Sequence, residues 1–545
     1  MPATQGAHAL TRVVTDGTDG CCDVLVVGAG IAGTQAALAA AQSGARVALA
    51  SAGSTFSGSS FFAGTWGLGL IAPDGENDVD DLADAICEVG RGVADPALAR
   101  VLAAGAGPAV ARLQALGCEL QEAGNAGERD FIPCFDRKHR SWHGLGRESY
   151  RAAMGAALAA AGVALLPHRE LLDLVSSSSQ DGEKCVTGTV LYDSEPNELQ
   201  IIGAKAVVLA TGGVGGLYRR TLTMPDVLGT AQAVALRHGA RLVNPEFIQI
   251  MPGLTAPVRD VVFNERTFRY ASVEGLDGRF TGELLDERAG HGPFTASLAD
   301  RAVDLAVVAA GDAGAQVGYH LPERLPEFMQ TYFDWFRTSF GRDPADGVRI
   351  APYAHASNGG IRIDAAAATG VSGLYACGEC TGGMHGADRI GGLSSANGLV
   401  FGHIAGTSAA AWASGAHHAP EASLTGKSDA VLPRLASREA PGALAGLRGL
   451  MQERCMVVRS EDGLLACLAG LHELEERVQG ALEPCEDARQ LAETRRAQDA
   501  LLTARALVTA MLARRESRGA HFRADAPDED PAQARPIIMG LADVL

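Results

Sequence analysis

Positive charge is scarce in this sequence. Its 545 residues include 46 lysines and arginines against 64 aspartates and glutamates, so the formal net charge is −18. A protein that binds nucleic acid needs a basic face to neutralise the phosphates. The charge balance therefore predicts no nucleic-acid partner.

Long apolar runs that would cross a membrane are lacking too. The first twenty residues contain neither an apolar core of signal-peptide length nor paired arginines. The most apolar stretch, residues 24–41, contains a glycine-rich turn and is better explained as part of a folded domain than as a span of roughly 18 apolar residues. We expect a cytoplasmic protein without a membrane span.

Cysteines with the spacing of metal or cluster ligands are missing as well. The 11 cysteines are odd in number and scattered, which is typical of a reducing compartment rather than of a disulfide framework. Cys377 and Cys380 form a CxxC pair, but they lie at a predicted strand-to-loop junction and not at a helix start. We expect neither a bound metal nor an iron–sulfur cluster.

Glycine, by contrast, is abundant, and the first glycine-rich motif has a clear context. An apolar strand predicted at 24–27 leads into Gly28, Gly30 and Gly33 with the spacing GxGxxG, followed by an alanine-rich helix and a second strand at 46–50. This pattern predicts a dinucleotide site in which the turn, including Ile31 and Ala32, holds a pyrophosphate at the helix N-terminus. Ser51 stands where an NAD site has its ribose-binding acid, which favours FAD.

Two further apolar strands end in glycines, within residues 205–216 and 373–379. Strand ends so far apart in sequence predict one discontinuous cofactor domain with another domain inserted into it. We expect the cofactor domain at 21–230 and 351–415, the insert at 231–350, and a helical bundle with heptad-like apolar spacing at 440–545. A chain of this length cannot pack around one core.

Within the insert, the sequence predicts a helix from Ala296 to Ala310. The segment 306–318 superficially imitates a second nucleotide-binding turn. Its glycines have the spacing GxxGxxxG rather than GxGxxG, which indicates a helix end and a turn before a short strand.

Six motifs in order carry a resemblance that covers residues 21 to about 530. They are GAGIAG, SGSSFFAG, ATGGVGGLY, HASNGGI, GLYACGECTGGMHGADRIGG and RESRGAHFRADAP. Their order and spacing resemble the flavoprotein family of succinate dehydrogenase, fumarate reductase and L-aspartate oxidase, closest to soluble L-aspartate oxidase-like members. The resemblance implies an α/β fold: a Rossmann-type FAD-binding domain interrupted by an α+β capping domain and followed by a C-terminal helical domain.

The resemblance also implies which residues bind FAD. Beyond the glycine turn and Ser51, these are Ser59, Ser60, Ala210, Thr211, Gly212, Glu379, His385, Ser394 and Ser395. The succinate dehydrogenase branch has a covalently linked histidine where this chain has Ser59. Non-covalent FAD is therefore the implied state.

The catalytic residues implied by the resemblance are His355, Arg389 and Arg301. His355 and Arg389 match the pair that binds a substrate carboxylate, and Arg301 is the best match to a capping-domain arginine that moves a proton. The residues support part of this independently, because a buried Arg389 in HGADRIGG must face an anion.

The second half of the substrate site departs from the family pattern. Relatives that act on C4 dicarboxylates have a histidine where Met251 stands and a Thr-Glu pair where Asn264 and Glu265 stand. Losing one charge-assisted hydrogen bond costs about 1.5–3 kcal/mol, and methionine cannot replace the donor. We assign Met251 and Glu265 to the substrate site and expect a substrate with one carboxylate and an apolar or aromatic remainder.

The implied reaction is hydride transfer between flavin N5 and a carbon next to a carboxylate. Two alternatives stay open: an L-aspartate oxidase of NAD biosynthesis with a rearranged clamp, and a flavin-binding subunit that passes electrons to a protein partner. The sequence contains no second NAD(P) motif and no cluster ligands, so the electron donor or acceptor stays open as well.

Overall fold

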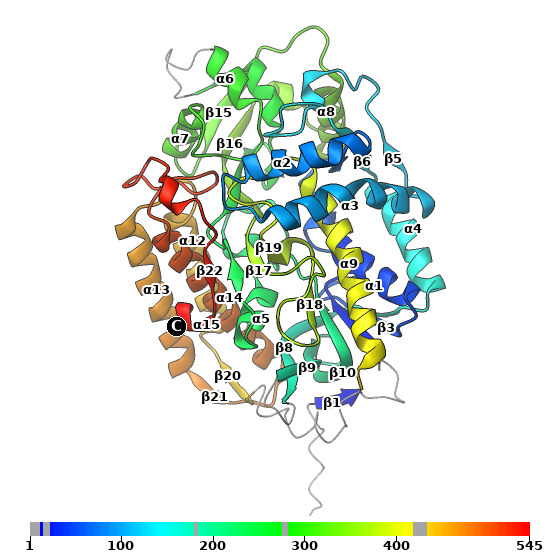
Figure 1. Cartoon of the computed structure of the whole chain (residues 1–545). Helices are drawn as coiled ribbons and strands as arrows, with labels where there is room; N and C mark the ends of the chain where they lie inside the picture. Colours follow the sequence, from blue (N-terminus) through cyan, green and yellow to red (C-terminus); the bar gives the residue numbers. More distant parts are fainter. Residues whose placement is uncertain (1–10, 15–21, 179–183, 275–281, 418–432) are drawn as a thin grey trace, which may run out of the picture.

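The architecture is centred on a sheet whose strands come from distant parts of the chain (Figure 1). The computed structural model describes residues 11–14, 22–178, 184–274, 282–417 and 433–545. The main sheet has the order β7-β3-β2-β10-β9-β8, with β18 and β1 also paired to β10. Its strands are β1 (Thr11–Val14), β2 (Cys22–Val27), β3 (Val47–Ala50), β7 (Ala164–Leu166), β8 (Arg169–Ser178), β9 (Lys184–Asp193), β10 (Glu198–Leu209) and β18 (Leu374–Ala376).

The three predicted strand ends meet in this sheet. β10 pairs in parallel with β2 on one side and with β18 on the other. The strand residues are almost entirely buried, as expected of parallel strands covered on both faces. One sheet thus collects strands from both sides of the long segment that separates β10 from β18.

Helices α1 (Ile31–Gln42) and α9 (Leu393–Gly415) pack closely on this sheet. Glycines of α9 make the approach possible: a Cβ at Gly402 would lie 2.5 Å from the Ala32 carbonyl oxygen, and one at Gly406 would lie 2.2 Å from that of Ala36. The two helices therefore meet backbone to backbone. Further helices of this half are α2 (Val79–Val89), α3 (Pro96–Ala115) and α4 (Arg147–Ala160).

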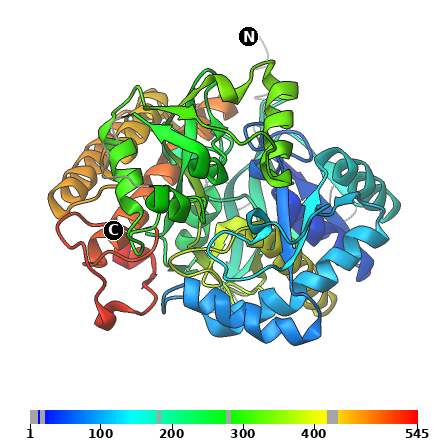
Figure 2. The same ribbon diagram turned by 90° about the horizontal axis from the view of Figure 1, so that it is seen from above.

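A second sheet, of five antiparallel strands, lies at the top of Figure 1. Its order is β13 (Val261–Val262), β12 (Ile248–Ala256), β16 (Val348–Ser357), β15 (Ala315–Tyr319) and β14 (Ala271–Val273). Helices α6 (Gly282–Arg288), α7 (Arg301–Ala309) and α8 (Glu327–Phe340) accompany it. Seen from above, these green segments lie beside the blue N-terminal elements (Figure 2).

The structure corrects the predicted start of the helix in this region and confirms the predicted turn within residues 306–318. The helix predicted from Ala296 begins at Arg301, because the backbone N–H groups of Phe294 and Ala296 donate to the carbonyls of Ile250 and Gly519 and hold this stretch out of a helix. Residues 306–318 contain a helix end, a turn and the start of β15, as the glycine spacing indicates.

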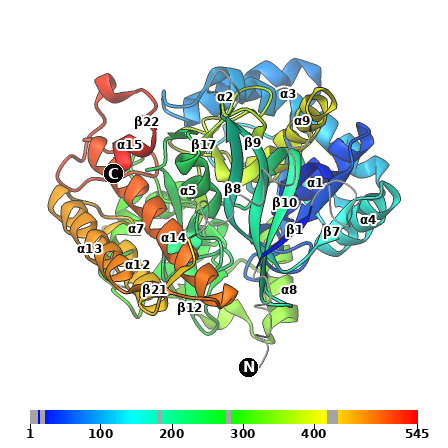
Figure 3. The ribbon, with the colours of Figure 1, turned by 90° about the horizontal axis from the view of Figure 1, so that it is seen from below.

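The C-terminal part forms a helical bundle of α12 (Ala440–Arg454), α13 (Glu461–Gly480) and α14 (Ala488–Ala513). Seen from below, these helices lie on one flank of the main sheet and α1 and α4 on the other (Figure 3). α14 packs against α5 (Thr230–Arg237). Among the described residues, no helix is long and apolar enough to cross a membrane.

Candidate active site

A cavity of about 630 Å³ lies at the carboxyl ends of the parallel strands. This is where open α/β sheets bind nucleotides, because loops from several strands converge there. Most of the residues predicted to bind the cofactor line it: Gly28, Gly30, Ile31, Ala32, Ser51, Ser59, Ser60, Ala210, Thr211, Gly212, Glu379, Ser394 and Ser395. The structure thus brings together five segments that are distant in sequence.

Two predicted cofactor residues do not line the cavity. Gly33 lies behind the turn, where a Cβ would be 1.7 Å from the Gly28 carbonyl oxygen, so its role is to let α1 pack on β2. His385 is buried next to Gly90, and burial together with Arg389 lowers its pKa to about 3. The structure places this imidazole away from the cavity wall.

The glycine turn is shaped for close approach of a phosphate group. Gly28 has φ of 110°, and a Cβ there would lie 2.2 Å from the Ala210 carbonyl oxygen. Gly30 precedes α1 without a side-chain cap of its own. The Ile31 N–H donates to Ser60 Oγ at 3.3 Å, and the next backbone N–H groups of the first turn are left available to an anion. The buried hydroxyls of Ser59 and Thr211 have no hydrogen-bond partner among the described residues. These features fit FAD.

Glu379 lies just after β18, in the short turn Gly378–Cys380. Its Oε1 accepts a hydrogen bond from the Ser357 backbone at 2.9 Å. Burial raises the pKa of this carboxyl. A half-buried acid that lines the cavity is suited to bind hydroxyls such as those of a ribityl chain.

Arg389 and His355 face the same cavity, and Gln249 of β12 joins them. Arg389 Nε donates to Gln249 Oε1 at 3.0 Å and Nη1 to the Ile390 carbonyl at 3.2 Å. Burial and Arg389 lower the pKa of His355 to about 3, so this imidazole is neutral. Its Nδ1 and the Gln249 amide nitrogen have no partner among the described residues. One cation and two polar groups with spare bonding capacity form an anion-binding corner.

Met251 and Glu265 lie outside the main cavity, around the thiol of Cys134. Cys134 Sγ donates to Glu265 Oε1 at 3.2 Å. A Cβ at Gly292 would lie 3.1 Å from Met251 Cε, 3.5 Å from Glu265 Cδ and 3.6 Å from Cys134 Sγ. The thiol therefore takes up part of the bonding capacity of the carboxylate.

This second group adjoins the anion-binding corner through the backbone. Gly391, two residues after Arg389, donates its N–H to the Cys134 carbonyl at 3.1 Å. Burial and Glu265 raise the pKa of the Cys134 thiol to about 12, so it stays protonated. Asn264 caps the turn Glu265–Tyr270 by accepting from the Arg266 backbone at 3.0 Å. Its oxygen is thus committed to the turn.

The structure does not bring Arg301 to His355 and Arg389. Arg301 Nη1 donates to the Ala296 carbonyl at 2.6 Å, and its guanidinium lies 5.6 Å from the ring centre of Phe522. The cause is the later start of α7, which makes Arg301 its first residue and directs the side chain to the C-terminal segment. No lining residue of the cavity comes from this helix within the described part of the chain.

Sequence reasoning did not single out Gln249 and Cys134. Gln249 could have been found from the sequence. It lies two residues before Met251 in a strand, so the two side chains are on the same face. Cys134 carried none, since its loop reaches the site only through tertiary packing.

Comparison with known proteins agrees with this site. A family model described as FAD binding domain matches residues 23–395, and one described as fumarate reductase flavoprotein C-term matches residues 445–536. The chain belongs to the flavoprotein family of fumarate reductase, succinate dehydrogenase and L-aspartate oxidase. It is accordingly an FAD-dependent oxidoreductase, and FAD is its cofactor.

Relatives and solved structures align over nearly the whole chain. L-aspartate oxidase of Caulobacter vibrioides is 32% identical over 94% of this chain and 95% of its own length. L-aspartate oxidase of Streptomyces coelicolor is 31% identical over 95% of this chain and 91% of its own. A variant of E. coli quinol fumarate reductase FrdA agrees on the fold, with a TM-score of 0.77 at 24% identity, covering 96% of this chain and 93% of its own.

Proposed function

We propose that this enzyme transfers a hydride between FAD and a carbon next to a carboxylate, in a substrate that is not a simple C4 dicarboxylate. The observation that carries the proposal is the asymmetry of the site. Arg389, Gln249 and neutral His355 form a corner for one carboxylate. The neighbouring wall offers Met251 and the Cys134–Glu265 pair instead of a second set of donors.

The corner can bind one carboxylate and stabilise the charge that develops beside it. Arg389 is held in a fixed orientation by Gln249 and supplies charge-assisted hydrogen bonds. His355 can donate one neutral N–H toward the same oxygen. When bound, FAD supplies a two-electron centre at its N5. Holding the carboxylate over that centre stabilises enolate-like charge between fixed, buried donors.

The wall at Glu265 disfavours a second carboxylate. Glu265 brings a negative charge, and the methyl group of Met251 brings no donor. A second buried carboxylate here would meet the carboxylate of Glu265, which is costly. The neighbouring Arg266 already pairs with Glu265, its Nε lying 3.7 Å from Oε1, and donates to the carbonyls of Ala289 and Ile132. An apolar or aromatic remainder would instead pack on Leu222, which lines the cavity and belongs to the same apolar cluster as Met251.

The test is a substrate panel with the FAD-loaded enzyme. We expect the anaerobically reduced enzyme to be reoxidised faster by 2-enoic monocarboxylates with apolar or aromatic tails than by fumarate, followed at the flavin absorbance band. Oxidation of L-aspartate, read as peroxide or as reduction of fumarate, should be absent. Clear turnover of L-aspartate would overturn the substrate assignment.

An L-aspartate oxidase with a rearranged clamp is the second candidate. The near full-length alignment with L-aspartate oxidases supports it. Turnover of L-aspartate in the same panel would establish it. A third outcome, reoxidation by a co-purifying protein but by none of the small molecules, would identify an electron-transfer subunit.

A further inference from the structure

The segment from the last residue of α6 to the first turn of α7, residues 288–304, is held in shape by polar contacts of its own; we call it the cap loop. Arg288 makes a two-pronged bond to Asp304, with Nε to Oδ2 at 2.7 Å and Nη2 to Oδ1 at 2.9 Å. His291 Nε2 lies 2.9 Å from Asp300 Oδ2. All four side chains are buried. These contacts fix the two ends of the cap loop and so hold its middle part, residues 293–298, in one conformation.

That middle part docks on other segments through three successive residues. Thr295 Oγ1 donates to Asp388 Oδ2 at 2.8 Å. The Ala296 N–H donates to the Gly519 carbonyl at 2.7 Å, and Ser297 Oγ donates to Glu529 at 2.5 Å. Of these contacts, only the first reaches the loop that carries Arg389.

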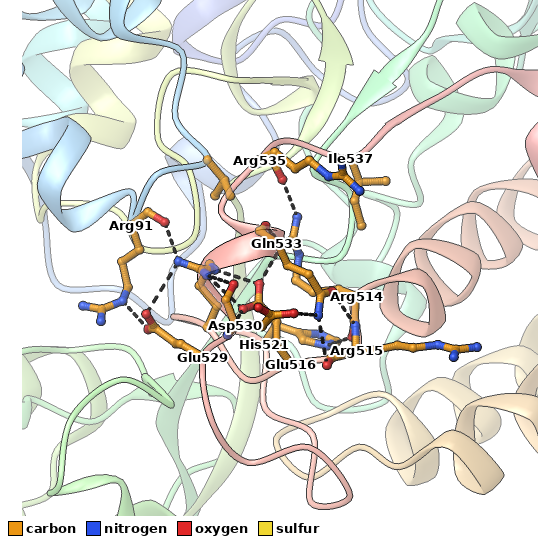
Figure 4. Close-up of polar contacts among 12 residues, drawn as sticks. Arg91, Arg514, Arg515, Glu516, His521, Glu529, Asp530, Gln533, Arg535 and Ile537 are labelled. Carbon is orange, nitrogen blue, oxygen red and sulfur yellow. Dashed lines mark hydrogen bonds and ion pairs between the residues drawn. The ribbon is translucent and has the colours of Figure 1, made fainter.

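Asp388 is therefore the link between the cap loop and the carboxylate-binding corner. It is the neighbour of Arg389 in the chain and is 3% exposed. Its Oδ1 is buried without a partner among the described residues. Two charged side chains from other segments act on it, Arg91 and Glu529, and these pair with each other (Figure 4). Neither bonds directly to the Asp388 carboxyl within the described residues.

We propose that Asp388 is a positioning residue that, through Thr295, holds the cap loop against the Arg389 loop, and that this docking weakens when its carboxyl ionises, because the buried ion loses more hydration than its one hydrogen bond replaces. The proposal rests on the proposed function, since the corner that Asp388 positions is the one assigned to the substrate carboxylate. In either form one oxygen has a donor in Thr295 and the other has no partner among the described residues, but a buried carboxylate loses far more hydration than a neutral carboxyl. A carboxylate there would be buried and half unsatisfied.

The direction of the pH effect follows from the pKa of Asp388. Burial raises this pKa from 3.8 to about 7. A raised acid pKa means that the docked arrangement favours the protonated form, so its contribution is complete below about pH 4 and is lost as the pH rises to about 7. Docking should therefore be tighter at pH 6 than at pH 8.

The experiment is amide hydrogen exchange of the FAD-loaded protein without substrate, at pH 6 and pH 8 and corrected for the intrinsic rates. We expect peptides covering residues 293–298 to lose at least tenfold protection at pH 8 in the wild type. Asp388→Asn, which keeps an acceptor for Thr295 but cannot ionise, should keep its protection at both values. Asp388→Ala should lose it at both, and the matched control Ser297→Ala should keep the pH dependence.

Activity provides the second readout, with a substrate found in the panel. The wild-type KM should rise between pH 6 and pH 8 and that of Asp388→Asn should not, while kcat changes by less than threefold. Protection in the wild type that does not change with pH, or an Asp388→Asn variant that keeps the wild-type profile, would overturn the proposal. The hydrogen-exchange measurement needs no substrate. A negative result in the substrate panel alone would therefore contradict the proposed function without affecting the proposed role of Asp388.

Discussion

Arg389 joins two parts of the fold: its backbone belongs to the loop after β19 (Thr381–Gly382), and its guanidinium is bound to Gln249 on β12 of the second sheet. One side chain thus fixes a charge and also ties the cofactor loop to the strand that carries Met251. The guanidinium of Arg301, in contrast, donates to the Ala296 carbonyl and lies close to the Phe522 ring. Substitution of Arg389 is therefore expected to lower activity strongly, and substitution of Arg301 to lower it little.

Arg389→Gln should lower kcat/KM by about 10–100-fold, because it removes charge-assisted hydrogen bonds worth about 1.5–3 kcal/mol. Flavin content should not change, which absorbance of the purified protein will show. Arg301→Gln is the matched control, and we expect a loss below threefold. A general acid contributes about 10²–10⁴-fold, so a loss of that size in Arg301→Gln would return Arg301 to the mechanism.

Ser59 predicts the state of the cofactor. Its hydroxyl lines the cavity where the succinate dehydrogenase branch has the linked histidine, and an unactivated hydroxyl cannot form that bond. Precipitating the enzyme with acid should therefore release all of the flavin into the supernatant. A yellow pellet after washing would show a covalent link and contradict the prediction.

At the scale of elements, the close contact between α1 and α9 sets the position of the glycine turn. Gly402→Ala would place a methyl group 2.5 Å from the Ala32 carbonyl oxygen, and such overpacking costs about 1–3 kcal/mol. We expect a lower melting temperature and weaker FAD retention after gel filtration. Gly107→Ala, in α3 with nothing within 4 Å of the added carbon, is the control and should be neutral or stabilising.

The same elements show how far the sequence predicts this molecule. The strands at 24–27, 205–209 and 374–376 were predictable because each is a short apolar run that ends in small residues, a local pattern. The start of α7 was not, because hydrogen bonds from Phe294 to Ile250 and from Ala296 to Gly519 override the local preference for helix. Cys134 reaches Glu265 across 131 positions of sequence, which no local pattern encodes.

At the scale of the whole molecule, a buried ionic cluster joins the C-terminal segment to the rest (Figure 4). Glu516, fully buried, accepts from Arg514 Nη1 at 2.9 Å and from Arg518 Nε at 2.7 Å. Arg514 also donates to Glu246 at 2.6 Å, and Arg518 to the Arg91 carbonyl at 2.7 Å. Removing the Glu516 carboxylate would leave Arg514 and Arg518 each without one of their hydrogen-bond acceptors.

Glu516→Ala should therefore lower the free energy of unfolding by about 3–5 kcal/mol, the usual cost of breaking one side of a buried ion pair. Urea unfolding followed by circular dichroism will measure it. Glu148→Ala is the control, since its pair with Arg151 is exposed and should cost at most about 1 kcal/mol. Equal effects of the two substitutions would contradict the assignment.

The nested order of the strands also has a consequence for biosynthesis. The second sheet is complete once Ser357 has been made, whereas the main sheet still awaits β18 at Leu374–Ala376. Since compact units fold while the chain emerges from the ribosome, the part built on the second sheet can fold while the strands of the main sheet wait for β18. The cavity for FAD can close only afterwards, so the nascent chain must keep the free edge of β10 from aggregating until β18 arrives.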